Sequence, residues 1–339
     1  MLIKKLTDIN GLPSWEDDIR KAIKEEIKDH VDSIITDRLG NLIAVKNEKT
    51  GGVHIGISAH MDETGLVVKS IEKSGLIKFE TWGVLPKILL SKTVKIGKDK
   101  VPGVIGAKPI HLQKPAERET VMELDKIFID IGATSKEDAE KHVQPGDYIA
   151  FDSEYRELGK HKIKAKALDD RLGCAAIIEI LKSDTKRKIT AIFCVQEEVG
   201  LRGSTVAANQ IYADLIINLE GTIAADSDDI DEHMRVTVQG QGPAISIKDR
   251  TSIYLKKYYE MMLKIAKEKK IPVQFRRTSA GGTDALNYHG AHGGTPVIGL
   301  SVPCRYIHSP VSICDKRDYK NLVALVKAFV NNYEEETKK

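Results

Sequence analysis

Hydrophobic residues recur along the chain at two spacings, which predict helices in some stretches and strands in others. Near the N-terminus we expect a helix capped by Ser14, with Asp17 at the capping-box position. Its apolar face is formed by residues at helical spacing, namely Ile19, Ile23, Ile27 and Val31. Two strands follow at 41–46 and 53–59, with a turn at Gly51-Gly52 between them, and His60 comes directly after the second strand.

Beyond about residue 160 the pattern alternates between strand-like and helix-like stretches. It predicts helices at 170–182, 252–270 and 318–333, and strands at 189–196, 215–219 and 297–302. Strands that alternate with helices favour a mostly parallel or mixed sheet covered by helices on both faces. The fold class expected from the pattern is therefore α/β.

The stretch from about 67 to 152 has a different texture, with short β-rich runs separated by glycines. The runs are GLIKFE, LLSKTVKIG, VPGVIGA, KIFIDIGA and GDYIAFD. They predict a small β-rich domain, residues 68–160, inserted into a discontinuous main domain formed by 1–67 and 161–339.

Charge and composition exclude several classes of protein. The 52 basic and 49 acidic residues give a net charge of +3 and are mixed along the chain, so no nucleic-acid partner is expected. The N-terminus turns polar too early for a signal peptide, and no apolar run approaches the roughly 18 residues of a membrane span. We therefore expect a cytoplasmic protein without a membrane partner. The four cysteines show no C-x-x-C spacing and are expected to be reduced and mostly buried.

Polar residues that directly follow apolar strands are the first candidates for chemistry, because α/β sheets bind ligands beyond the carboxyl ends of their strands. The candidates that follow strands are His60 and Asp62 in ISAHMDE, Glu197 and Glu198 in CVQEE, Glu220 in INLEGT and His308 in SVPCRYIHSP. A further candidate is KALDDR, in which Asp169 and Asp170 precede a helix whose first amides favour negative charge.

Two imidazoles and three carboxylates from separate segments suit a pair of divalent ions such as zinc or cobalt, with one carboxylate bridging both. A bridging hydroxide would balance the remaining charge and attack a carbonyl. Glu197 and Glu198 should point in different directions in an extended segment, so that one acts as ligand and the other as base. Singly, each residue has an ordinary structural explanation, and only their combination indicates a site.

Other motifs are less informative. The sequence GTDA at 282–285 fits either a substrate loop or a turn before a short helix. His289 and His292 are expected to be exposed loop histidines. A phosphate-binding loop, a GxSxG nucleophile elbow and a dinucleotide fingerprint do not occur in the sequence, which disfavours nucleotide hydrolysis, serine esterase chemistry and NAD-dependent redox chemistry.

Six motifs in order give the chain a family resemblance: AHMDETG, ALDDRLGC, VQEEVGLRGS, NLEGT, GGTDA and PCRYIHSP. The chain resembles the tetrahedral (TET) aminopeptidases, dinuclear metallo-exopeptidases similar to glutamyl and deblocking aminopeptidases, whose relatives have often been labelled endoglucanase. The resemblance spans nearly the whole chain. It implies a zinc-exopeptidase fold with a PDZ-like or barrel dimerisation domain inserted, and a homo-oligomer of twelve subunits built from dimers.

The resemblance also implies a role for each site residue. His60, Asp169 and Glu220 would hold one metal ion, and Asp169, Glu198 and His308 the other, with Asp169 bridging. Asp62 would orient His60. Glu197 would be the general base that activates water and then protonates the leaving amine.

The function expected from these residues is a metal-dependent aminopeptidase acting on small peptides by attack of a metal-bridging hydroxide. The alternatives are a deacylase of amino-acid derivatives with the same two-metal site, an endoglucanase-type glycoside hydrolase, and a shell protein without catalysis. The last two are disfavoured because aromatic residues make up only 5% of the chain and every expected ligand is present. The side-chain preference is left open, with 247–250 and 276–282 as the segments that would determine it.

Overall fold

The computed structural model of the protein describes residues 1–277 and 280–333. Thr278, Ser279 and residues 334–339 lie outside this part, so the specificity segment expected at 276–282 is only partly described. The chain separates into two compact units. The larger unit comprises Met1–Glu63, Tyr155–Ile307 and Ser312–Lys339, and the inserted unit comprises Thr64–Glu154 and His308–Val311.

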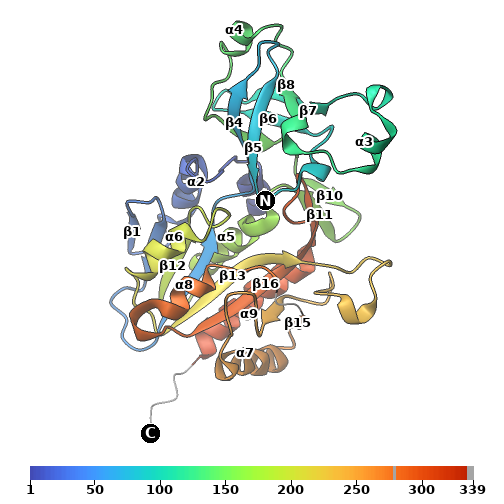
Figure 1. Ribbon diagram of the computed structural model, residues 1–339. Helices are drawn as coiled ribbons and strands as arrows, with labels where there is room; N and C mark the ends of the chain where they lie inside the picture. Colours follow the sequence, from blue (N-terminus) through green and yellow to red (C-terminus); the bar gives the residue numbers. More distant parts are fainter. Residues whose placement is uncertain (278–279, 334–339) are drawn as a thin grey trace. The chain divides into compact units, whose positions relative to one another are not determined.

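The larger unit is built on one mixed sheet of eleven strands (Figure 1). Along its main path the order is β1 (Ser33–Thr36), β2 (Leu42–Lys46), β12 (Lys188–Cys194), β3 (His54–His60), β13 (Leu215–Ile223), β16 (Val297–Arg305), β17 (Ser312–Asp315), β11 (Lys162–Ala165) and β10 (Arg156–Leu158). The remaining two strands are β14 (Ala244–Ser246), which pairs with β16, and β15 (Gln274–Arg276), which pairs with β14.

The four central strands of this sheet run parallel, and the strands toward both edges are antiparallel. Cys194 at the end of β12 pairs with His60 at the end of β3. Because these strands point the same way, the residues that follow them emerge at one edge of the sheet. The α/β fold class expected from the sequence is confirmed, with a mixed rather than purely parallel sheet.

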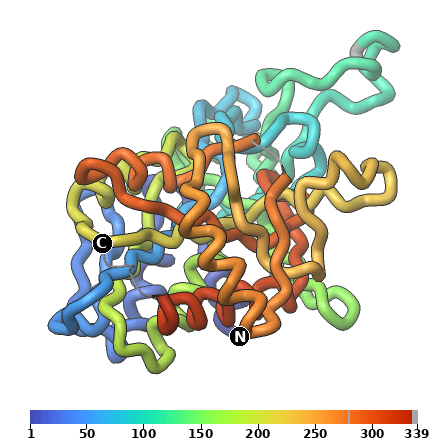
Figure 2. Tube along the Cα trace, turned by 90° about the horizontal axis from the view of Figure 1, so that it is seen from below, coloured from blue at the N-terminus to red at the C-terminus, as the bar shows by residue number. Residues whose placement is uncertain are grey.

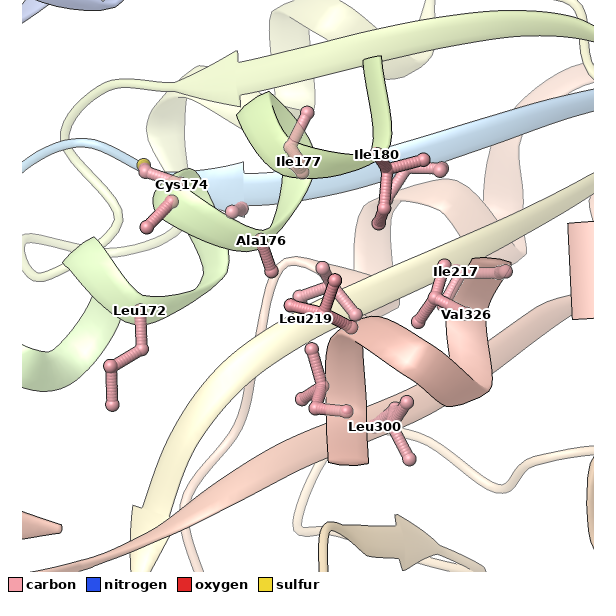
Figure 3. Close-up of a cluster of buried hydrophobic side chains, with 14 of the residues drawn as sticks. Leu172, Cys174, Ala176, Ile177, Ile180, Ile217, Leu219, Leu300 and Val326 are labelled. Carbon is pink, nitrogen blue, oxygen red and sulfur yellow. The ribbon is translucent and has the colours of Figure 1, made fainter. Parts of the chain in front are cut away.

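Helices cover both faces of the sheet, and alternate strand residues face the two layers. In β12, Phe193 belongs to the core under one layer and Cys194 to the core under the other. The first layer holds α1 (Leu2–Thr7), α2 (Asp17–Ile27), α5 (Leu168–Leu181), α7 (Lys256–Lys269) and α9 (Lys316–Asn332), and the second holds α6 (Arg202–Ala208) and α8 (Ala285–Gly290). Figure 3 shows α5 and α9 side chains packed against β13 and β16 in the first core.

The start of α2 differs from the sequence expectation. The helix begins at Asp17 with Glu16 as its N-cap residue, whereas Ser14 lies outside it with a left-handed φ of 74°. Ile19, Ile23 and Ile27 are buried as predicted, but the helix ends at Ile27, so Val31 is not part of it. The capping prediction was wrong because Glu16 is held by a tertiary contact that the local pattern does not contain.

The inserted unit is a closed barrel of six strands in the order β4 (Gly65–Ile71), β5 (Ile77–Trp82), β8 (Ile127–Asp130), β7 (Val101–Ala107), β6 (Thr93–Ile96) and β9 (Tyr148–Phe151). Alternate strand residues such as Ile77, Phe79 and Ile129 fill its core. Its short helices are η1 (Pro86–Ile88), η2 (Ile110–Leu112), α3 (Pro115–Glu119), η3 (Leu124–Lys126) and α4 (Lys136–Ala139). The small inserted β-fold expected from the glycine-punctuated runs is therefore present.

Two connections of the larger unit are irregular. Residues 224–238 form a long loop after β13 that contains η4 (Glu232–Met234) and projects from the sheet in both views (Figure 2). A second turn, η5 (Ala291–Gly293), follows α8. Within residues 1–277 and 280–333, no helix combines the length and apolar character needed to cross a bilayer.

Candidate functional site

His60 is the last residue of β3 and is almost fully buried. Its Nδ1 lies 3.2 Å from the carbonyl oxygen of Asp62 and 3.5 Å from that residue's Oδ1. Donation from Nδ1 to Asp62 would make Nε2, on the opposite side of the ring, the nitrogen available to a metal ion. On that side lie carboxylate oxygens of Asp169 and Glu220, each 3.6 Å from Nε2.

Asp169 and Asp170 lie in an irregular first turn of α5, where both have non-helical backbone angles and the peptide bond between them is cis. Asp169 Oδ1 accepts a hydrogen bond from the Gly221 amide at 3.2 Å. Asp170 is fully buried; its Oδ1 accepts from the Gly173 amide, and its Oδ2 has no hydrogen-bond partner among the described residues. Asp170, His60 and Glu220 bring ligand atoms within 4.8 Å of one another.

The sequence makes Asp169 and Asp170 a candidate pair but predicts only Asp169 as a metal ligand, so the position of Asp170 beside His60 and Glu220 was not expected. The signal available in the sequence was its adjacency to Asp169 in ALDDR. That adjacency could not decide which of the two carboxylates would turn toward His60, because the irregular backbone of this turn is set by tertiary packing.

Glu197 and Glu198 follow β12 on a turn rather than on an extended segment, because Gln196 has a left-handed φ of 55°. Both glutamates therefore bring a carboxylate oxygen within 4.8 Å of His60 and of each other, although we expected them to diverge. The turn is fixed by Asp62, whose Oδ1 accepts from the Glu197 amide at 2.9 Å and whose Oδ2 accepts from the Glu198 amide at 3.0 Å.

Glu220 is buried near the end of β13. Its Oε1 accepts a hydrogen bond from Asn218 Nδ2 at 2.9 Å, and its Oε2 faces His60. Because Asn218 and Glu220 are two residues apart in a strand, their side chains share one face of the sheet. The strand therefore delivers this carboxylate already oriented.

The electrostatics of this group are those of several carboxyl groups that are buried close to one another. Burial raises the pKa of Glu198 to about 8, with further contributions from the Asp169 and Asp62 charges. Burial likewise raises the pKa values of Asp170, Glu197 and Glu220 well above the usual carboxyl range, although His60 opposes each rise. For His60, burial lowers the pKa, but hydrogen bonds to Asp169 and Asp62 outweigh it and raise the pKa.

These residues fit a divalent cation. Two atoms that ligate a tetrahedral zinc ion at 2.0–2.2 Å lie about 3.4 Å apart, close to the 3.6 Å from His60 Nε2 to the oxygens of Asp169 and Glu220. A positive ion would also offset the burial and the mutual repulsion that raise the carboxyl pKa values. Buried carboxylates and an imidazole are the ligands that zinc and cobalt accept.

His308 belongs by its contacts to the inserted unit, on the segment His308–Val311 between β16 and β17. It has a left-handed φ of 56°, and its Nδ1 lies 3.0 Å from the carbonyl oxygen of Gly83. Donation from Nδ1 to a carbonyl leaves Nε2 as the nitrogen with a lone pair, which is the usual arrangement of a histidine ligand. Its role as a ligand remains a prediction.

A buried ion-pair cluster supports the segments that carry His60 and Asp169. Lys166 Nζ contacts the two carboxylate oxygens of Glu63 at 2.6 and 2.7 Å. Arg171, fully buried, donates to the carbonyl oxygen of Met61 at 2.8 Å and to that of Leu6. These contacts join the segment after β3 to the start of α5. They therefore fix the position of His60 relative to Asp169.

The GTDA segment and its neighbouring histidines are placed as follows. Asp284 is buried directly before the short helix α8, and its Oδ1 accepts from Ser204 on α6. His292 is exposed and stacks on Tyr212 with ring centroids 3.7 Å apart, whereas His289 lies half-buried in α8. The second half of the motif is thus a turn before a short helix.

Comparison with known proteins assigns the family. A profile of the M42 glutamyl aminopeptidase family matches residues 40–325. The chain belongs to this family. It is therefore an aminopeptidase by family, a hydrolase of peptides, and the fold described above is that of the TET aminopeptidases in it.

The alignments with individual relatives extend over nearly the whole length of this M42 aminopeptidase. An aminopeptidase of the archaeon Desulfurococcus kamchatkensis is 37% identical, with a TM-score of 0.93 over 98% of this chain and 94% of that one. The Pyrococcus horikoshii TET1 peptidase, which can assemble into a tetrahedron or a large octahedral shell, is 32% identical with a TM-score of 0.86 over 98% of both chains. A lysyl aminopeptidase of Pyrococcus furiosus is 31% identical over 97% of this chain and 96% of its own length.

Proposed function

We propose that this M42 aminopeptidase removes N-terminal residues from short peptides with a pair of divalent metal ions, zinc or cobalt. The observation that carries the proposal is the position of His60, whose Nε2 is 3.6 Å from both Asp169 and Glu220 among buried carboxylates with raised pKa values. His60, Asp169 and Glu220 would hold one ion. Asp169, Glu198 and His308 would hold the other, with Asp169 shared.

Bound ions of this kind supply Lewis-acid polarisation of the scissile carbonyl and lower the pKa of water. The residues of the chain provide the remaining steps. Glu197 takes a proton from the attacking water on its carboxylate and then gives that proton to the nitrogen of the leaving peptide. Burial raises the pKa of Glu197, which favours a carboxylate able to hold the proton between these two steps.

Asp62 acts in this scheme through two neighbours. Its backbone carbonyl faces Nδ1 of His60, and its carboxylate holds the amides of Glu197 and Glu198. One residue therefore keeps a ligand histidine, a ligand carboxylate and the base in a fixed relation. Asp170 is available as a further ligand beside His60 and Glu220.

We infer the assembly and the cellular setting from the relatives alone. A homo-oligomer of twelve chains built from dimers is supported by the tetrahedral assembly of the Pyrococcus horikoshii relative. The catalytic role of residues 1–67 and 161–339, the dimerisation role of residues 68–160 and the cytoplasmic location belong to the same proposal. Light scattering should give about twelve times the mass of one chain, which is 37.6 kDa.

The experiment measures release of free amino acids from unblocked and N-acetylated short peptides, with zinc or cobalt added or removed by a chelator. Glu197→Gln is compared with the wild type, and Glu179→Gln serves as the control. Glu179 is also half-buried, but it accepts from Tyr319 Oη in the packing of α5 against α9. Loss of general-base catalysis should lower kcat about 10²–10⁴-fold in Glu197→Gln only.

Trimming that is restricted to free N-termini, stops with chelator and survives in Glu179→Gln would support the proposal and reveal the side-chain preference. Release of acyl groups from N-acylated amino acids without trimming of free peptides would replace it with a deacylase. No release from any peptide with zinc or cobalt present would refute it, and polysaccharides would then be tested for the endoglucanase alternative.

A further inference from the structure

Glu16 occupies the N-cap position of α2, but within the described residues of that turn its side chain makes no capping hydrogen bond. Carboxylates at this position usually accept from an amide in the first turn of their own helix. The side chain of Glu16 is instead only 2% exposed, turned into the protein. A buried acid that does not cap its own helix must be held by another contact.

That contact is with the turn after β12. Glu16 Oε1 accepts a hydrogen bond from the backbone amide of Gln196 at 3.1 Å. Gln196 has a left-handed φ of 55°, a backbone conformation that residues other than glycine rarely adopt. Glu16 therefore holds the amide of the residue at which the chain turns from β12 toward Glu197.

Four consecutive amides in this turn end on side chains rather than on backbone carbonyls. The amide of Val195 donates to Asn41 Oδ1 at 3.0 Å, and the amide of Gln196 donates to Glu16. The amides of the next two residues, Glu197 and Glu198, donate to the carboxylate of Asp62. The direction of the turn is thus set by three side chains, of which only Asp62 is already part of the proposed site.

We propose that Glu16 is a positioning residue for the proposed metal site, acting through the Gln196 amide to set the turn that carries Glu197 and Glu198. The inference rests on the proposed function only for its catalytic consequence. The structural part of the inference is that Glu16 orients the turn and protects its amides from exchange. This part rests on the hydrogen bonds alone.

The role requires an acceptor oxygen and not a charge. Burial, together with the nearby charge of Asp62, raises the pKa of Glu16 to about 7. A carboxylic acid and a carboxylate both keep an oxygen that accepts from an amide. Glutamine keeps that oxygen in the same place, whereas methionine has a similar length and offers no comparable acceptor.

The experiment compares Glu16→Gln and Glu16→Met with the wild-type full chain by three measurements. Hydrogen–deuterium exchange reports on the amides of residues 195–203, calorimetry with cobalt or zinc chloride reports the metal dissociation constant, and peptide trimming reports kcat and KM. Glu16→Met should exchange these amides about tenfold faster and lose about tenfold in kcat with little change in KM, because small misplacements of catalytic groups reduce kcat. Its metal dissociation constant should rise, and Glu16→Gln should remain close to wild type in all three.

Two control variants separate this role from general damage to α2. Asp17→Asn changes an exposed acid at the first position of the same helix, and Ile19→Val loosens the packing of that helix without touching the turn. Both should leave exchange at 195–203 unchanged. If Glu16→Met does not fold, Glu16→Ala, which leaves room for a water, takes its place.

Unchanged exchange at 195–203 in Glu16→Met would overturn the inference, as would an equal loss of activity in Glu16→Gln with the turn still protected. A wild-type enzyme that trims no peptide would refute the proposed function instead. In that case faster exchange and weaker metal binding in Glu16→Met would still support the structural part.

Discussion

Asp62→Asn is the substitution that tests the geometry of the site most directly. The wild-type carboxylate is fully buried and accepts one amide on each oxygen, from Glu197 at 2.9 Å and from Glu198 at 3.0 Å. Asparagine has almost the same shape but presents an NH₂ group in place of one oxygen. One of the two amides must then face a donor instead of an acceptor.

The size of the effect follows from the hydrogen bond that is lost. A hydrogen bond to a charged group contributes about 1.5–3 kcal/mol, and every 1.4 kcal/mol corresponds to a factor of ten. If the whole of this energy is lost from the correct placement of Glu197 and Glu198, metal affinity or kcat should fall about 10–150-fold. This range overlaps the roughly 10–100-fold expected for removing a group that orients a metal ligand.

The assay measures the metal dissociation constant by calorimetry and kcat at limiting and saturating cobalt. Asp318→Asn is the matched control, because Asp318 is equally buried and also accepts one amide on each oxygen, from Gly240 at 2.7 Å and Gly242 at 2.8 Å. Both variants should unfold at lower denaturant, but only Asp62→Asn should bind metal more weakly. Equal metal affinity and kcat in Asp62→Asn and wild type would refute the assignment of Asp62.

Three further predictions concern stability and thiol chemistry. Lys166→Met leaves the buried Glu63 without its closest cation and should lower the free energy of unfolding by about 3 kcal/mol in urea titrations, with partial recovery when Glu63→Gln is added. Asp315→Ala should cost about 1 kcal/mol at pH 7, because Asp315 caps α9. Although burial opposes it, Arg317 lowers the pKa of Asp315, so this stabilisation is complete above the unfolded pKa of about 3.9. It is lost as pH falls through the lower folded pKa. An equal difference in the free energy of unfolding between wild type and Asp315→Ala at pH 7 and at pH 2 would contradict this sign. Thiol reagents should modify none of the cysteines in the native protein and all four after unfolding, because all four are buried. They are Cys174, Cys194, Cys304 and Cys314.

The sequence indicated the main elements of the larger unit because their hydrophobic periods are regular. Phe193 and Cys194 face opposite cores, as the period of two in a strand requires. The predicted boundaries were less accurate: β12 ends at Cys194, two residues early, because the next amides donate to Asn41 and Glu16. Contacts of that kind join residues more than 150 positions apart and leave no local pattern.

The candidate site was predictable to the extent that its residues follow strands. His60 is the last residue of β3 and Glu220 lies near the end of β13, toward the carboxyl ends of parallel strands, where an α/β sheet concentrates its binding groups. Asp170 was not assigned as a ligand and Glu16 was not identified, since an acid beside another acid and an acid before a helix both look like ordinary helix starts. Their burial, which distinguishes them, exists only after the chain has packed.

The sequence by itself determined the fold class, the existence of an inserted β-rich segment and the residue types that could bind metal, because periodicity and strand-end polarity are local properties of the chain. Only the tertiary structure decided that β3 and β12 pair in parallel with His60 beside Cys194, and that the turn after Cys194 is held by Glu16, Asn41 and Asp62. Strand register and buried polar contacts depend on which distant segments meet. The relative placement of His60, Glu197 and Glu198 is therefore a property of the packed molecule.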